Sequence, residues 1–157
     1  MPLWEGRMET GHGQSLKHPA DPPAIVRRCF HRTVFLAAGL YNIAWGLYAA
    51  YDPQWLFRFA GLPPANHPQL FACLGMVIGL YGLLYLEVAR LPERGWLIAA
   101  VGLTGKFLGP IGLLVEITRG TWPPATLILC VTNDFIWWLP FALYLHDAWP
   151  HRDWRWS

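Results

Sequence analysis

A lysine stands in the middle of an apolar stretch of this 157-residue chain. The segment VGLTGKFLGPIGLLVEI, residues 101–117, carries Lys106 near its centre. An isolated ammonium at the middle of a lipid bilayer costs roughly 2.5 to 3.5 kcal/mol even on a lenient insertion scale. If this segment crosses a membrane, the lysine needs a partner that keeps it away from lipid.

Asp134 is the expected partner. Lys106 lies fourteen residues before Gly120 and Asp134 lies fourteen residues after it, so two helices that turn near Gly120 hold the two charges at the same depth. Asn42 is the central residue of another apolar segment, which adds a third polar side chain to this plane. We expect Asn42 or Asn133 to satisfy the remaining donors and acceptors, because a half-satisfied buried ion pair is worse than none.

Three more residues complete the candidate site. Glu116 follows Lys106 by ten residues, on nearly the same helical face and about 15 Å nearer the surface, where it could extend a polar track outward. Trp137 and Trp138 are candidates to enclose a ligand together with Lys106. Two interpretations stay open: a structural polar clamp that sets helix register, or a proton relay or ligand site, which is the usual role of ionisable groups inside a membrane.

The elements that position these residues follow from composition. The chain is 54% hydrophobic and 14% charged, with ten Trp. Its apolar residues form four blocks, each close to the ~20 residues that a membrane helix needs: 33–51, 70–88, 96–115 and 125–145. The blocks lack the polar face of a soluble amphipathic helix and the alternation of a β-barrel strand. The sequence therefore predicts an all-α, four-helix transmembrane bundle, residues 30–148.

Two further features shape the predicted bundle. The segment YDPQWLFRFAGLPPANHP between the first two spans predicts a short interfacial helix, with Trp55, Leu56 and Phe59 on the bilayer and Arg58 at the headgroups. Small residues recur every three or four positions in the first three spans, a pattern that lets helix backbones touch. It predicts tight packing and argues against a wide pore through one chain.

Basic residues predict the orientation. Nine of them fall on one side of the predicted spans, and only Arg58 and Arg119 fall on the other, so we expect both termini in the cytoplasm. The net charge of +2 is then a topology signal and needs no nucleic acid to explain it. Residues 1–29, in which Met8 is an alternative start, predict a disordered cytoplasmic tail, and residues 149–157 a short cytoplasmic C-terminal tail.

Several kinds of chemistry find no support. The three cysteines, Cys29, Cys73 and Cys130, show no metal-ligand spacing, and no phosphate-binding loop, nucleophile elbow or zinc-protease helix occurs. We therefore predict no metal, no bound cofactor and no catalytic residue, and nothing in the sequence indicates an enzyme.

Two strings carry a resemblance. At GKFLGPIG (105–112) and NDFIWWLPF (133–141) the chain resembles a group of small bacterial four-helix membrane proteins, and its plan of spans resembles, more loosely, the DoxX-like superfamily. The resemblance covers residues 30–147. It implies a bacterial inner-membrane location, and the DoxX likeness implies a link to quinone chemistry or to membrane complexes.

Three functional hypotheses follow. In the first, the protein binds a small lipophilic or anionic ligand at the Lys106 and Asp134 plane, either as an oligomeric transporter or as an accessory subunit. In the second, it is a redox subunit that contacts quinone. In the third, it is a membrane scaffold in which the charges only set packing. The expected partners are the lipid bilayer and either further copies of the chain or a membrane complex.

Overall fold

The computed structural model describes residues 24–149. Its elements, in chain order, are α1 (Arg28–Tyr51), α2 (Trp55–Phe59), α3 (Pro68–Arg90), η1 (Pro92–Arg94), α4 (Trp96–Thr118), η2 (Pro124–Thr126), α5 (Leu127–Cys130), η3 (Val131–Phe135) and α6 (Ile136–Asp147). The predicted tails lie largely outside the described residues. Helix α1 begins at Arg28, close to the predicted end of the N-terminal tail at residue 29.

Four segments are long and apolar enough to cross a membrane: α1, α3, α4 and the interrupted helix over 124–147. The predicted all-α architecture with four spans is confirmed. Each helix extends beyond its predicted span at one or both ends, since hydropathy marks only the apolar part of a helix while its hydrogen bonding continues into the polar ends.

Large apolar side chains cover the outward surface of all four segments. More than half of the side-chain surface is exposed at Leu47, Leu80, Leu108 and Leu139, one from each segment. A soluble protein rarely exposes apolar surface continuously on every helix. The surface is thus compatible with a membrane location.

The helices α1 and α3 form a tight antiparallel pair. A methyl group placed on Gly46 would lie 2.5 Å from the carbonyl oxygen of Gly75, and one on Gly82 would lie 2.6 Å from the carbonyl oxygen of Gly39. Glycine at these positions lets the two backbones touch, as the small-residue pattern predicted.

The second pair consists of α4 and the interrupted fourth segment. This segment starts with the 3-10 turn η2, continues through α5 and then widens into the π-helical turn η3 before α6. Pro110 lies inside α4 and Pro140 inside α6. A proline removes one helical hydrogen bond, and a π turn changes the hydrogen-bond step from four residues to five, so this pair is less regular than α1 and α3.

One end of the bundle is closed by a dense core. Phe35 of α1 contacts Phe141 and Tyr144 of α6, with ring centroids 4.5 and 4.7 Å apart. The Tyr144 hydroxyl donates to the carbonyl of Pro92 at 2.6 Å. Asp147 ties the same end together, because its carboxylate accepts hydrogen bonds from Arg27 and from the buried His31.

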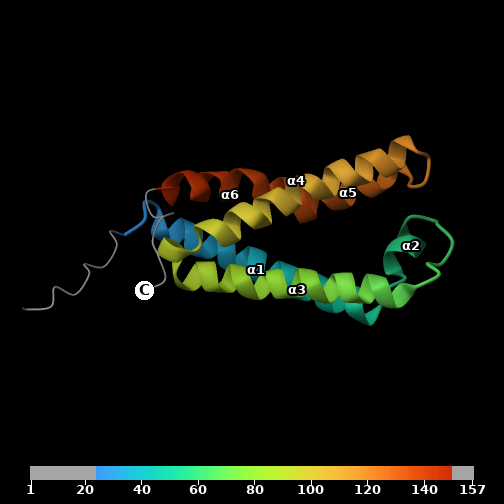
Figure 1. Cartoon of the computed structure of the whole chain (residues 1–157), viewed down its shortest axis with the longest axis horizontal. Coiled ribbons are helices and arrows are strands. Elements are labelled where there is room, and N and C mark those ends of the chain that lie inside the picture. Colours follow the sequence, from blue (N-terminus) through green and yellow to red (C-terminus); the bar gives the residue numbers. More distant parts are fainter. Residues whose placement is uncertain (1–23, 150–157) are drawn as a thin grey trace, which may run out of the picture.

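The opposite end is spread open and α2 lies there. Figure 1 shows the two helix pairs close together near the start of α1 and diverging toward the end that holds α2. Phe57 of α2 contacts Phe71 of α3 at 5.5 Å and Trp122, in the link after α4, at 5.6 Å. The predicted short helix between the first two spans is present, and it bridges the two pairs at the open end.

Candidate functional site

Lys106 is buried in the middle of α4, with 6% of its surface exposed. Its Nζ donates a 2.6 Å hydrogen bond to the main-chain carbonyl of Asn133. Asn133 lies in the π-helical turn η3, and turns of this kind occur frequently at functional sites. The same ammonium lies 5.8 Å from the ring centroid of Trp137, within range of a cation-π contact.

Asp134 is buried beside Lys106, with 5% of its surface exposed. Its Oδ1 accepts a 3.0 Å hydrogen bond from the side-chain amide of Asn133. Its carboxylate lies against Gly109, where a Cβ would be 3.6 Å from Oδ2. Gly109 follows Lys106 by three residues, on the same face of α4. The third and fourth segments therefore do bring the two charges to one level.

The direct ion pair expected from the sequence does not form. Among residues 24–149, the pairs with nitrogen and oxygen within 4.0 Å do not include Lys106 and Asp134. Instead, Asn133 links them: its main-chain carbonyl accepts from the ammonium and its side-chain amide donates to the carboxylate. The π turn decides this arrangement, because it sets which groups of residues 131–135 face α4. No pattern in the sequence predicted this turn.

An inner cavity of about 350 Å³ lies at this level. Its polar lining comes from Lys106, Asp134, Asn133 and Asn42, and its apolar lining comes mainly from α3 and α4. Asn42 is 5% exposed, and its side chain makes no hydrogen bond within the described part of the chain. Its amide is not among the side-chain atoms that are fully buried without a partner, so it faces the cavity and is open to a molecule there.

An outer cavity of about 410 Å³ continues toward the open end. It shares Gly109, Asn133 and Asp134 with the inner cavity and is lined further out by Glu116. Glu116 pairs with Arg119 at 2.8 Å. The polar track from Lys106 toward Glu116 stays a prediction, because most of the residues that line the outer cavity between the two levels are apolar.

The glycines of α4 line the cavities instead of packing against a helix. A Cβ built on Gly105 or Gly112 meets nothing within 4 Å, while the space at Gly102 is filled by the ring of Tyr85. The small-residue pattern had predicted that the whole row packs against a neighbouring helix. That prediction was correct for α1 and α3 but not for most of α4. A repeat of small residues is compatible with either arrangement, because it lets a neighbouring helix approach closely or leaves an unfilled space.

Trp137 and Trp138 do not line either cavity. Trp138 stacks on Phe107 with centroids 4.2 Å apart, and its Nε1 donates to the Lys106 carbonyl at 3.1 Å. Trp137 Nε1 donates to the carbonyl of Thr132 at 3.2 Å. The two rings support the polar cluster from outside and do not enclose a ligand with Lys106.

Tyr81 and Tyr85 were missed by the sequence analysis. Both line the inner cavity, on successive turns of α3. Their four-residue spacing beside Gly82 was the available signal, because it places two aromatic rings on one helical face. Cys130, for which the sequence showed no metal-ligand spacing, lines the outer cavity and is buried.

The described residues hold no cluster of three or more His, Cys, Asp or Glu side chains that could bind a metal ion. Comparison of the chain with models of known protein families, with curated proteins and with solved structures gives no match. The chemistry of the site must therefore be argued from its own residues.

Proposed function

We propose that this chain is an integral membrane protein that binds a small molecule in the inner cavity, at the level of Lys106 and Asp134. The expected ligand is mostly apolar and carries one polar group that both accepts and donates hydrogen bonds. Tyr81, Tyr85 and Val101 would contact its apolar part.

The unpaired amide of Asn42 carries this proposal. A structural clamp would satisfy its polar groups within the protein, because its function is to join the helices. The Asn42 amide instead lines the cavity. Here Asn42 has no partner in the described part of the chain, and Lys106 uses one of its three N–H donors. These groups line a space large enough for a small molecule, which supports a binding site over a scaffold.

The charge of the cavity limits the chemistry of the ligand. Lys106 and Asp134 contribute opposite charges, so the pair is neutral and favours a neutral polar group over a multiply charged one. An anionic group would have to bind the ammonium while avoiding the carboxylate. The preferred candidates are amphiphilic molecules with a hydroxyl, amide or carbonyl group.

The closed end bears on transport. The rings of Phe35, Phe141 and Tyr144 are fully buried and lie between the inner cavity and the end of α6. The cavities thus lead from Asp134 toward α2 and not through the bundle. This favours a receptor or accessory subunit over a transporter that acts as a single chain, and transport would require the closed core to open or a second copy to contribute.

The quinone hypothesis remains a second candidate through the DoxX-like resemblance. A quinone carbonyl would accept a hydrogen bond from Lys106 in the inner cavity. The hypothesis no longer includes an enclosing pair of tryptophans, because Trp137 and Trp138 lie outside the cavity. This hypothesis would be eliminated if the purified protein neither binds ubiquinone nor changes the reduction potential of ubiquinone.

Mass spectrometry of protein purified from native membranes tests the main proposal. We expect a bound small molecule in the wild-type protein and its loss in Asn42→Leu, which fills the space and removes the amide. Thr104→Ala is the matched control, because Thr104 lies on the same helix as Lys106, is exposed and bonds only Ala100. Equal retention by the wild type and Asn42→Leu, or an empty wild-type cavity, would contradict the proposal.

A further inference from the structure

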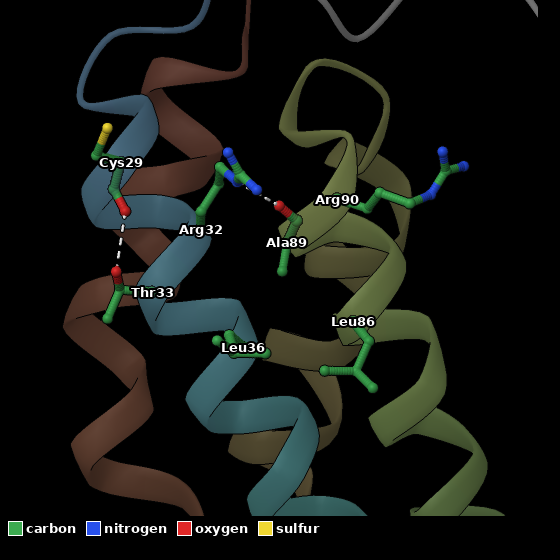
Figure 2. Close-up of a pocket in the computed structure, with 7 residues that line it drawn as sticks. All are labelled: Cys29, Arg32, Thr33, Leu36, Leu86, Ala89 and Arg90. Atoms are coloured by element: carbon green, nitrogen blue, oxygen red, sulfur yellow. Dashed lines mark hydrogen bonds between the residues drawn. The ribbon is translucent and has the colours of Figure 1, made fainter.

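Besides the two cavities, a groove lies at the closed end, between the first turns of α1 and the last turns of α3. Its volume is about 590 Å³. It is separate from the two internal cavities and is lined by residues of α1 and α3 alone (Figure 2): Cys29, Arg32, Thr33, Leu36, Leu86, Ala89 and Arg90.

Arg32 has no carboxylate partner among the residues that the structure describes. Five other arginines pair with an acid: Arg27 with Asp147, Arg28 with Glu93, Arg58 with Asp52, Arg90 with Glu87 and Arg119 with Glu116. Arg32 instead donates from Nε to the carbonyl of Ala89 at 3.1 Å. Within residues 24–149 its two terminal nitrogens have no acceptor, so the groove holds a positive charge that the described residues do not neutralise.

The bond to Ala89 also positions the guanidinium. It links α1 to the end of α3 and holds the guanidinium across the groove, as Figure 2 shows. The guanidinium of Arg90 points away from α1 in the same view and is bound to Glu87 by bonds of 2.6 and 2.7 Å. Arg32 is thus the arginine of the groove that is available for an anion.

Below Arg32 the groove becomes apolar. Leu36 follows Arg32 by one helical turn and is 48% exposed, and Leu86 lies across from it on α3. The groove therefore presents a cation at the helix end and an apolar wall toward the middle of the helices. This order, with a charged end and then an apolar wall, matches a phospholipid, whose phosphate lies at the bilayer surface and whose acyl chains run inward.

We infer that this groove binds one anionic phospholipid, with its phosphate on the terminal nitrogens of Arg32 and an acyl chain along Leu36 and Leu86. The planar guanidinium suits a phosphate because it can donate two parallel hydrogen bonds. The inference rests on the membrane placement in the proposed function, but it does not depend on the ligand of the inner cavity.

Cys29 supplies a direct measurement. It is exposed and lines the groove, whereas Cys130 is buried, so Cys73→Ser removes the other exposed thiol. The Cys73→Ser protein is placed in nanodiscs of phosphatidylcholine, with or without phosphatidylglycerol, and the rate of Cys29 alkylation by a neutral maleimide is measured. We expect phosphatidylglycerol to slow alkylation about five-fold, the factor that corresponds to ~1 kcal/mol for one arginine near anionic lipid.

Two substitutions distinguish lipid binding at Arg32 from a general effect of bilayer charge on the alkylation rate. Arg32→Gln should abolish the protection. Arg90→Gln removes the same charge from the same end of the bundle, and because Arg90 forms an exposed pair it should leave the protection intact. Protection that survives in Arg32→Gln, or that falls equally in both variants, would overturn the inference.

Further arms distinguish the remaining outcomes. Inorganic phosphate added to phosphatidylcholine nanodiscs should not protect Cys29, and protection there would mean a soluble anion in place of a lipid. Arg32→Lys keeps the charge and is used if Arg32→Gln does not fold. It should reduce the protection, because lysine lacks the planar guanidinium that donates two parallel hydrogen bonds. Full protection in Arg32→Lys would overturn the role of the guanidinium. A chain that stays in solution without entering nanodiscs would contradict the membrane placement, whereas an embedded chain without selective protection contradicts only the groove.

Discussion

The ammonium of Lys106 reaches Asp134 through Asn133, the residue directly before the carboxylate. The Asn133 carbonyl accepts from Nζ at 2.6 Å and the Asn133 side chain donates to Asp134 at 3.0 Å. The two charges therefore share a level and a cavity without a direct bond. Each is left with hydrogen-bonding capacity that a ligand can use.

Removing one of these charges should destabilise the protein more than removing both. Lys106→Met leaves the buried Asp134 carboxylate without a compensating charge, which costs roughly 3 to 5 kcal/mol. The double variant Lys106→Met, Asp134→Asn removes both charges and should recover more than half of that loss. Thermal unfolding in detergent compares the stability of the wild type, the single variant and the double variant. A double variant as unstable as the single one would show that the two charges are not coupled.

Glycine substitutions should separate packing from space. Gly46→Ala places a methyl against the backbone of α3 and should cost about 1 to 3 kcal/mol of stability, as overpacking does. Gly105→Ala meets nothing within 4 Å and should leave stability unchanged, while it narrows the inner cavity and weakens retention of the bound molecule. If Gly105→Ala unfolded as readily as Gly46→Ala, the cavity beside α4 would not exist in the folded protein.

The link between α3 and α4 should respond to acid. Burial is the largest single effect on the pKa of Glu93 and raises it, but the hydrogen bond and charge of Arg28 together with main-chain hydrogen bonds outweigh it, so the pKa lies below its ordinary value. The stabilising effect is therefore complete above the ordinary glutamate pKa and is lost as the pH falls through the lowered value. Thermal stability measured across this acidic range should decline in the wild type. The decline should be smaller in Glu93→Gln, and an identical pH profile would contradict the assignment.

Asp147 should be the main polar support of the closed end. Its carboxylate accepts from Arg27 at 2.7 and 2.8 Å and from His31 at 2.8 Å, which joins the start of α1 to the end of α6. Asp147→Asn should cost about 2 kcal/mol, in the range for hydrogen bonds to charged groups. The control is Asp52→Asn, whose partner Arg58 is exposed and whose loss should cost ~0.5 kcal/mol. Equal losses in thermal stability would show that the closed end does not depend on this cluster.

The short helix α2 should restrict access to the outer cavity. Phe57 contacts both helix pairs, and Cys130 is buried in the cavity behind it. In a variant in which Cys130 is the remaining cysteine, Phe57→Ala should increase the rate of Cys130 alkylation several-fold. Phe59→Ala, on the same helix but exposed, is the control. An unchanged rate in Phe57→Ala would mean that α2 does not cover this opening.

Parts of the site were predictable because they depend on distance along the chain. The equal offsets of Lys106 and Asp134 from Gly120 fixed their common depth, since two antiparallel helices of equal rise return to the same level. Asn42 followed from its central position in the first span. Tyr81, Tyr85 and the emptiness beside Gly105 did not follow, because they depend on how each helix is rotated and on which neighbour it faces.

The sequence by itself determined that this protein has four helices long and apolar enough to span a membrane, a short helix between the first two, and a polar level in the middle. These properties are local, since they come from runs of apolar residues and the turns between them. Only the tertiary structure decided that α1 and α3 pack tightly while the glycines of α4 line a space, and that the π turn inserts Asn133 between the charges. A row of small residues and a pair of opposite charges each allow more than one arrangement, and packing against the other helices selects one of them.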